Sequence, residues 1–465
     1  MKEESVAKLI LTKYTGDSAE LLQFFLRAFL QKIPPAYRRL FKENELANFI
    51  LARFYTFVEI TETNSSVEIH TGKEDDPVFS RRALVDIAVT NGPFVVETTH
   101  SYFSFNKLSR ILGIHFTLDL SSKGKPEEVS YSFYALEPIN KENLKENEDF
   151  LRKSLDGVKI VTKSFGKILS SIDRTASLLA GEKSSTETIN CIRWMRGNNF
   201  IYMGTGRIHF PGKGNPPQFV GGDETGLLAA ESGLQEKFLS CLSVEGKKPI
   251  SFIVTNEISF VHRFENIILV RVRLPNPGEE FIMTGNFSSA AKRLEFATIP
   301  VIREKVKWLL DERGYVTNSY DYKHECTLLQ KIPLEEFFSL PSDTLEEITA
   351  FLNGISGGEA LEFHLHTNIS HKLFVGIITL TEDMFTPTLF SSIKNVFDKE
   401  LKRPFRSYKN SLNNERIILH FYSSIGEVPE IDTERVESKI REICKSWESR
   451  IVEQVHAVSG GEKSS

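Results

Sequence analysis

The stretch ALVDIAVTNGPFVVE, residues 83–97, holds the junction on which the fold prediction depends. Its opening run, ALVDIAV, is typical of a buried strand, and apolar residues at helical spacing follow over residues 93–111. Between them lies Asn-Gly-Pro, three residue types that turns prefer. We therefore predict a strand that turns directly into a helix, with Gly92 at the N-cap and Pro93 at the first helical position.

Two interpretations of this turn stay open. Asn-Gly-Pro is a good strand-to-helix connection by residue chemistry alone. The same turn is suited to hold a carboxylate, because a helix N-terminus presents free backbone N–H groups and glycine lets a ligand approach the backbone closely. If the turn binds a small effector, the contacting residues are expected to be Asn91, Gly92, Pro93 and Phe94.

The neighbouring sequence predicts the order β-α-β-β-α around this turn. The segments that form it, in chain order, are residues 83–89, 93–111, 114–120, 129–136 and 145–155, with a further strand expected near 157–161. This order is typical of a ferredoxin-like sandwich, which has helices on one face of an antiparallel sheet and leaves the other face open.

The last third of the sequence repeats the pattern. It contains a strand over residues 372–380, a helix over 386–401, strands over 405–410 and 416–422, and a closing helix. The apolar stripe of that closing helix is Val436, Ile440, Ile443, Trp447, Ile451 and Val455. Between the two units, residues 199–290 are rich in predicted strands, and a helix is expected from Pro300 to Gly314.

The predicted fold class is therefore α+β and multidomain. A chain of 465 residues is longer than one hydrophobic core usually organises, so several domains are expected. They are an N-terminal helical segment (1–55), a first β-α-β-β-α unit (56–182), a mixed, β-rich central α+β domain (183–340) and a second unit with the C-terminal helix (341–465).

Composition and charge exclude several classes of protein. A net charge of −5 and an isoelectric point near 6.2 give no global field that would attract nucleic acid or an anionic membrane. The N-terminal apolar run LLQFFLRAFL is too short to span a bilayer, and no signal peptide is recognisable. We expect a cytoplasmic protein with no nucleic-acid or membrane partner.

The motifs of common catalytic sites are missing from the sequence. It has no GxGxxG after a strand, no GxxxxGK[ST], no GxSxG and no HExxH. The glycine-rich loop 212–226 has the wrong spacing for a phosphate loop and contains two prolines, which favours a solvated loop. The four cysteines are far apart and have no zinc-like spacing. We therefore expect no catalytic, cofactor-binding or metal site in this chain.

Two further clusters have both a functional and a simpler interpretation. His364 and His366 would share one face of a strand and, with a third ligand, could coordinate zinc or nickel, but exposed strand histidines are the simpler interpretation. The basic segment LKRPFRSYK, residues 401–409, could contact an RNA backbone. A helix C-terminus followed by an edge strand explains the same residues with fewer assumptions.

Longer segments carry a resemblance to a known family. The strand, Gly-Pro turn and helix within a β-α-β-β-α unit resemble an ACT domain, a small module that binds amino acids and regulates metabolic enzymes. The chain is also similar to the large bacterial NAD-dependent glutamate dehydrogenases, in the region that follows their first ACT domain. The similar segments are ETINCIRWMRGNNFIYMGTGRIHF, DETGLLAAESG, FIVTNEISFVHR, GNFSSAAKRLEFATIPVIREKVKWLLDERGY, LLQKIPLEEFF, KLFVGIITLTEDMF and KSWESRIVEQ.

The resemblance implies the N-terminal, ACT-containing and non-catalytic region of such an enzyme. In that family the dehydrogenase module lies nearer the C-terminus, so the resemblance implies NAD for that module and no cofactor for this chain. The sequence departs from the family pattern in two places. The helix after Gly92-Pro93 is several residues longer, and the second unit has TEDMFTPT where the first has TNGPF. Both departures argue against ligand binding, more strongly in the second unit.

Three functions are compatible with these observations. The leading hypothesis is a regulatory and oligomerisation region of an NAD-dependent glutamate dehydrogenase, which converts glutamate to 2-oxoglutarate and ammonium. Such a region would bind an amino-acid effector, act on a catalytic module in cis or in trans, and form a homo-oligomer. The alternatives are a structural scaffold that binds nothing and a freestanding ACT-type amino-acid-binding regulator of another protein.

Overall fold

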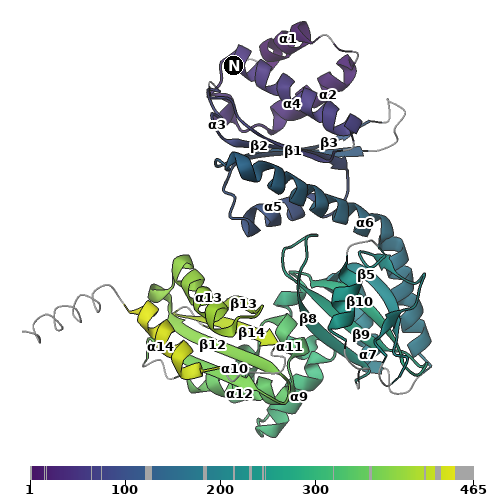
Figure 1. Cartoon of the computed structure of the whole chain (residues 1–465), viewed down its shortest axis with the longest axis vertical. Helices are drawn as coiled ribbons and strands as arrows, with labels where there is room; N and C mark the ends of the chain where they lie inside the picture. Colours follow the sequence, from purple (N-terminus) through teal and green to yellow (C-terminus); the bar gives the residue numbers. More distant parts are fainter. Residues whose placement is uncertain are drawn as a thin grey trace, which may run out of the picture.

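The structure of the 465-residue chain is a computed structural model. The residues that it describes are 3–14, 16, 18–63, 65–74, 76–120, 128–181, 186–212, 215–229, 233–242, 246, 248–317, 319–355, 359–412, 415–424 and 431–445. They form three antiparallel sheets that follow one another along the chain, each with helices packed on it (Figure 1). The prediction of a multidomain α+β fold is confirmed at this level.

The first sheet contains the strand that opens the sequence argument. Its strands are β1 (Val67–Thr71), β2 (Ala83–Thr90), β3 (Arg110–Asp119) and β4 (Glu128–Leu136), in the antiparallel order β1-β2-β4-β3. Helix α5 (Val95–Phe105) carries the chain from β2 across β4 to β3. Strand β4 is buried along almost its whole length, its two serines, Ser130 and Ser132, included.

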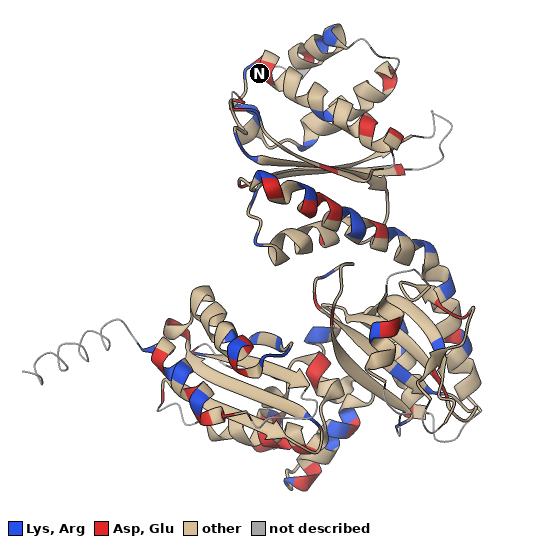
Figure 2. Ribbon diagram, viewed as in Figure 1, with Lys and Arg blue, Asp and Glu red and all other residues tan. Residues whose placement is uncertain are grey.

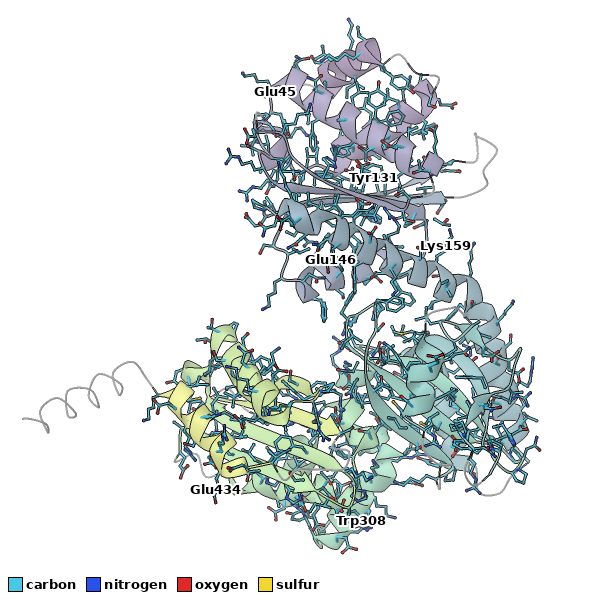
Figure 3. All side chains as sticks on the ribbon, in the orientation of Figure 1. Glu45, Tyr131, Glu146, Lys159, Trp308 and Glu434 are labelled. Carbon is cyan, nitrogen blue, oxygen red and sulfur yellow. The ribbon has the colours of Figure 1, made fainter. Side chains whose placement is uncertain are left out.

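Helices cover both faces of this sheet, so the predicted open face is wrong. Helices α1 (Glu3–Lys13), α2 (Ala19–Lys32), α3 (Pro35–Arg38) and α4 (Glu43–Thr63) lie on one side, and α5 and α6 (Lys141–Leu179) lie on the other (Figure 1). The N-terminal layer packs through aromatic side chains: the Phe25 ring lies 4.9 Å from the ring of Tyr131 in β4, centroid to centroid. Figure 3 shows Tyr131 at the level of the sheet, beneath these helices.

Three local predictions around the turn need correction. Helix α5 begins at Val95 with Phe94 as its N-cap, two residues later than predicted, and it ends at Phe105 instead of residue 111. Residues 157–161 lie inside α6 and form no strand. The fourth strand of the sheet is β1, which precedes the unit in the chain and pairs with β2.

The second sheet forms the centre of the chain, as the β-rich pattern predicts. It follows α7 (Thr186–Trp194) and the π-helical turn Met195–Asn199. Its strands are β5 (Phe200–His209), β6 (Gln218–Phe219), β7 (Thr225–Gly226), β8 (Ile250–Ile258), β9 (Asn266–Arg273) and β10 (Glu279–Phe287). They lie in the order β6-β5-β10-β9-β8, with β7 paired to β5, and α8 (Leu234–Ser240) is inserted between β7 and β8. Strands β9 and β10, adjacent in the chain, pair as an antiparallel hairpin.

The third sheet has the same strand order as the first. It consists of β11 (Leu361–Asn368), β12 (Leu373–Thr381), β13 (Arg406–Ser411) and β14 (Arg416–Ser424), in the antiparallel order β11-β12-β14-β13. Helices α13 (Pro387–Leu401) and α14 (Thr433–Cys444) cover one face. Of the stripe predicted for the closing helix, Val436 and Ile440 are buried, whereas Trp447, Ile451 and Val455 lie outside the described residues.

A helical layer joins the second and third sheets. Two 3₁₀ turns, Ala291–Arg293 and Phe296–Thr298, lead into α9 (Ile302–Glu312), α10 (Tyr320–Leu329), α11 (Leu334–Ser339) and α12 (Ser342–Gly354), and the 3₁₀ turn Glu382–Met384 precedes α13. The buried residues of α9 are Ile302, Val306, Leu309 and Leu310. This layer shares one core with β12, β14 and the central sheet.

Helix α6 connects the first unit to the centre. It is 39 residues long and contacts β1 at one part of its length and β5 at another. One apolar core runs from Val85 of β2 and Leu151 of α6 to Leu269 of β9. Figure 2 shows acidic and basic residues interspersed along the exposed side of α6. The helices of the described residues include none long and apolar enough to cross a membrane.

Candidate functional site

The turn after β2 is fixed at its start by two hydrogen bonds from Asn91. Asn91 donates its backbone N–H to the Glu128 carbonyl at 2.7 Å and its side-chain Nδ2 to Glu128 Oε2 at 2.9 Å. Phe94 has a φ of 73°, in the left-handed region that non-glycine residues seldom adopt. The first helical hydrogen bond runs from the Thr98 N–H to the Phe94 carbonyl at 2.8 Å, so the N–H groups of the first turn have no partner within the helix.

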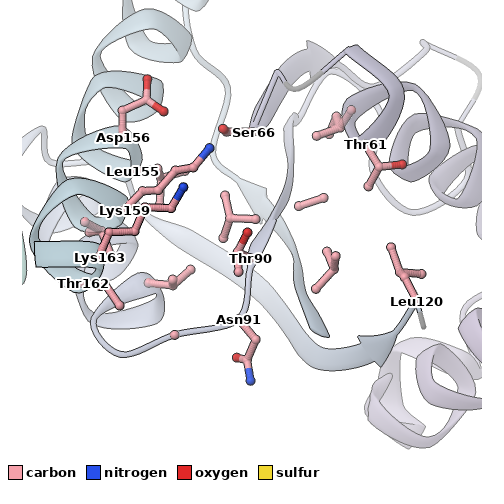
Figure 4. Close-up of a pocket in the computed structure, with 17 residues that line it drawn as sticks. Thr61, Ser66, Thr90, Asn91, Leu120, Leu155, Asp156, Lys159, Thr162 and Lys163 are labelled. Atoms are coloured by element: carbon pink, nitrogen blue, oxygen red, sulfur yellow. The ribbon is translucent and has the colours of Figure 1, made fainter. Parts of the chain in front are cut away.

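A cavity of about 160 Å³ lies beside this turn, at the end of the first sheet (Figure 4). Its lining comes from α4, β2 and the turn, the ends of β3 and β4, and α6: Ile60, Thr61, Ser66, Ala88, Val89, Thr90, Asn91, Gly92, Val95, Leu120, Val129, Leu155, Asp156, Val158, Lys159, Thr162 and Lys163. The volume is below the roughly 300–1,000 Å³ of sites for drug-sized ligands. The cavity is therefore small for a ligand site.

Two lysines give the cavity a positive side. Lys159 and Lys163 lie one turn apart on α6, and Figure 4 shows both ammonium groups directed from the helix toward Ser66 and Thr90. The carboxylate of Asp156 points away from them in the same view. The hydroxyl oxygen of Thr162, also on the lining, is buried and has no hydrogen-bond partner among the described residues. An anionic group in the cavity would meet two cations.

The structure brings only part of the predicted site to the cavity. Asn91 and Gly92 line it, but the Asn91 amide is bonded to Glu128 and points away from the lysines. Pro93 is exposed and not part of the lining, and the Phe94 ring packs against His262 at 5.1 Å between ring centroids. Whether these residues bind an effector stays a prediction.

Sequence reasoning missed the α6 side of the cavity. The spacing of Lys159 and Lys163 places both on one helical face, but only if the segment is read as helix. The strand predicted near residues 157–161 hides this spacing. The contributions of Ile60, Thr61 and Leu120 depend on tertiary packing and have no sequence signal.

The two histidines of β11 are engaged by neighbouring side chains. His364 stacks on Phe351 of α12 with ring centroids 5.4 Å apart, and burial lowers its pKa. His366 Nε2 lies 3.4 Å from a carboxylate oxygen of Glu347. The described residues contain no group of three or more His, Cys, Asp or Glu side chains that could hold a metal ion.

The basic segment 401–409 has the simpler arrangement. Lys402 is the C-cap of α13, and Arg406 opens the edge strand β13. Arg406 is buried against Glu336, with Nε 2.6 Å from Oε1. The Lys409 ammonium lies over the Phe385 ring. Residues 401–409 contain four basic side chains. At least two of them, Arg406 and Lys409, contact other side chains of the protein, which disfavours their binding to an RNA backbone.

Comparison with known proteins gives two matches. Residues 299–352 match the family model described as glutamate dehydrogenase, helical motif 1. The NAD-specific glutamate dehydrogenase of Halomonas elongata is 20% identical over 281 residues. Both matches support the glutamate dehydrogenase family. The aligned region covers 56% of this chain and 17% of the Halomonas protein, so this chain spans a small part of that glutamate dehydrogenase.

The glutamate dehydrogenase helical motif falls on a defined layer of the structure. Residues 299–352 include α9, α10, α11 and nearly all of α12, which pack between the central sheet and the third sheet. The cavity at the β2–α5 turn lies outside this motif, in the first unit.

Within the described residues, no parallel β-α-β crossover is present that could bind NAD, the nucleotide in the name of the Halomonas glutamate dehydrogenase, in the manner of a dinucleotide fold. Dinucleotide folds bind the pyrophosphate at a helix N-terminus within a parallel β-α-β crossover. Every strand pair among the described residues is antiparallel. The dehydrogenase chemistry of that relative is therefore not assigned to the residues of this chain.

Proposed function

We propose that the chain is a non-catalytic regulatory and oligomerisation region of an NAD-dependent glutamate dehydrogenase and that it senses an amino acid. The parent enzyme would convert glutamate to 2-oxoglutarate and ammonium through a catalytic module in cis or in trans. The observation that carries the proposal is the cavity in which Gly92 of the turn faces Lys159 and Lys163 of α6. The two matches support the family.

In this proposal the two units with equal strand order are ACT-like domains, at residues 56–182 and 341–465. An N-terminal helical segment (1–55) and a central domain (183–340) complete the chain. Both four-stranded sheets have the order that places the first strand of the β-α-β-β-α unit beside its third. The shared order supports a duplicated unit, and the cavity supports effector binding in the first copy.

The chemistry of the cavity defines the expected effector. Its carboxylate would lie near the Lys159 and Lys163 ammonium groups and the backbone of Gly92, with Asn91, Pro93 and Phe94 shaping the turn. Free N–H groups and the positive end of the α5 dipole add to this preference for an anion. Glu97, in the first turn of α5, already places a negative charge near the positive end of the helix dipole. It would therefore weaken the preference of this site for an anionic ligand.

The test is calorimetric titration of the intact chain with each of the twenty L-amino acids. We expect at least one to release heat with the wild type and none with Gly92→Val. A Cβ at position 92 would make an ordinary contact, 3.6 Å from Cγ2 of Thr162 in the cavity lining, so the substitution adds apolar bulk beside the cavity.

A pair of variants on one helix provides the matched control. Lys159→Gln and Lys163→Gln together should weaken binding, whereas Lys167→Gln, exposed on the same helix and outside the lining, should leave the affinity unchanged. A wild type that responds to no amino acid would rule out the sensing role.

A structural scaffold is the second candidate. It is favoured by the Asn91 amide that is already bonded and by the Phe94 ring that is already packed. A scaffold predicts assemblies whose melting temperature does not change with any amino acid. A third candidate, a freestanding regulator, is separated from the leading proposal by the size of the native polypeptide on a denaturing gel. A band far above 52.9 kDa supports a catalytic module in cis.

A further inference from the structure

The loop between β8 and β9, residues 259–265, leaves the central sheet and docks on the helices of the first unit. Figure 1 shows this part of the molecule directly below α5 and α6. The backbone His262 N–H donates to Thr98 Oγ1 of α5 at 2.8 Å, and both residues are buried. The His262 ring meets the Phe94 ring edge to face at 5.1 Å between centroids.

The same loop contacts α6 at a glycine. A Cβ placed on Gly157 would lie 2.6 Å from Cε2 of Phe260, closer than real Cβ atoms come, and 3.0 Å from Cγ2 of Val261, a tight contact. Val261 is fully buried in the core that the first unit shares with the central sheet. A glycine inside a helix costs stability relative to alanine. The close approach of the loop explains why a glycine is nevertheless present at position 157.

An aromatic contact extends the docked surface. The Phe264 ring lies 5.3 Å from Phe105, 5.9 Å from Phe150 and 6.1 Å from Tyr102, centroid to centroid. These spacings are within the range in which aromatic pairs attract one another. Phe105 belongs to α5 and Phe150 to α6, so Phe264 bridges the two helices.

The loop itself is internally braced. Ser259 N–H donates to the Glu265 carbonyl at 2.8 Å and closes the loop, and the Ser259 hydroxyl donates to the Val261 carbonyl at 2.7 Å. His262 has a φ of 65°, a left-handed conformation that is costly unless the surroundings impose it. A braced loop transmits a displacement at its tip to β8 and β9 instead of absorbing it.

We propose that the β8–β9 loop positions the candidate effector turn and couples it to the central sheet. This inference rests on the proposed function for the nature of the ligand. Gly92 and Val95 line the cavity while Phe94, between them, contacts the loop. On α6 the same alternation occurs: Val158 lines the cavity and Gly157 contacts the loop. A shift of either element on the cavity side therefore changes the loop contact on the other side.

The positioning residues are Thr98, Gly157 and His262, and their effect is thermodynamically reciprocal. If an effector favours the docked loop by a given factor, docking of the loop raises the affinity for that effector by the same factor. Thr98 and Gly157 are outside the cavity lining, so substituting them changes the loop contact without touching a ligand.

The first experiment is amide hydrogen exchange on the intact, ligand-free chain with Gly157→Ala. Alanine must displace Phe260, so exchange should rise in residues 259–265 and also in residues 94–99 at the start of α5. Gly166→Ala on the same helix is the matched control, because a Cβ there meets nothing within 4 Å. We expect Gly166→Ala to leave exchange at both segments unchanged.

A second variant keeps the test decisive if Gly157→Ala fails to fold. Thr98→Val removes the acceptor of the His262 N–H while preserving shape, and exchange at 94–99 and 259–265 should rise about tenfold, as a net hydrogen-bond contribution of about 1.4 kcal/mol implies. Thr98→Ser keeps the hydroxyl and should restore protection, which a loss of packing alone would not predict.

These results separate the coupling from the sensing role. Exchange is measured without ligand, so a wild type that binds no amino acid removes the proposed function and leaves the coupling to be judged on its own. Faster exchange at 259–265 with unchanged exchange at 94–99, in both Gly157→Ala and Thr98→Val, would overturn the coupling.

Discussion

Asp86 is a carboxylate in the middle of β2 with no exposed surface. Arg53 of α4 donates to one of its oxygens and the Tyr131 hydroxyl of β4 donates to the other. Burial raises the pKa of Asp86, and the Arg53 guanidinium beside it acts in the opposite direction. His70 Nε2 lies 2.8 Å from Arg53, and burial lowers the pKa of His70 to about 4. The cluster ties the N-terminal helical layer to the sheet.

Asp86→Asn should destabilise the chain strongly. The amide keeps the shape but leaves the buried Arg53 charge uncompensated, and removing one partner of a buried ion pair costs about 3–5 kcal/mol. The measurement is urea unfolding of the intact chain followed by far-ultraviolet circular dichroism.

Glu74→Gln is the control for Asp86→Asn. It breaks the Arg81–Glu74 pair, whose side chains are 72% and 82% exposed, and should cost about 0–1 kcal/mol. Equal effects of the two substitutions would contradict a structural role for the buried cluster.

Among the elements, helix α6 contains two glycines, Gly157 and Gly166, that lie in different environments. Gly157 is held by Phe260, whereas Gly166 is exposed and has open space around its Cα. Gly166→Ala should therefore stabilise the chain by about 0.5–1 kcal/mol, because alanine restricts the unfolded backbone and fits the helix. The check is the urea midpoint. A stability unchanged or lowered by Gly166→Ala would mean that the helix is not formed at this position.

The same helix shows what the sequence could and could not predict. Strands with a strong apolar pattern, such as β2 and β12, lie where the sequence predicts them, because burial on both faces makes them nearly continuous apolar runs. The β-branched residues Val158, Ile160 and Val161 favour a strand by local propensity. Packing against the β8–β9 loop overrides that propensity, and such packing is not encoded in any local pattern.

The candidate site was predictable only on its turn side. Asn91 and Gly92 carry a local signal, since their residue types define the turn. The position of the N-cap was misjudged, because the positive φ of Phe94 is imposed by its surroundings, not by its residue type. Lys159 and Lys163 reach the cavity because α6 continues past residue 155, where the sequence predicts its end, so their role is visible only in three dimensions.

For the whole molecule, the question is what holds the third sheet to the rest. Glu336 of α11 is fully buried and accepts two hydrogen bonds from Arg406 of β13, at 2.6 and 3.0 Å, and one from the Tyr408 hydroxyl at 2.9 Å. Lys305 of α9 donates to the carbonyls of Phe337, Phe338 and Leu340 at 2.8 to 2.9 Å and fixes α11 in turn. The family-matched helical layer is thus the anchor of the second unit.

Arg406→Met should release the third sheet from this layer. Glu336 would stay buried with only Tyr408 as a partner, at a cost of about 3–5 kcal/mol, and β13 and β14 would lose their polar anchor. We expect faster amide exchange in residues 406–424 and no change in β2, which belongs to a separate core. Arg303→Gln, which breaks a more exposed pair with Glu187, should have a much smaller effect.

A double variant tests whether the Arg406–Glu336 ion pair itself stabilises the folded chain, or whether breaking it is costly only because a buried charge is left without a partner. If Arg406→Met with Glu336→Leu recovers most of the lost stability, the pair itself adds little beyond well-packed apolar side chains, and the damage in Arg406→Met comes from the uncompensated carboxylate. If the double variant stays as unstable as the single one, the bidentate geometry supplies net stability. If amide exchange in residues 406–424 stays slow in Arg406→Met, neither explanation holds. Apolar packing alone would then hold the third sheet.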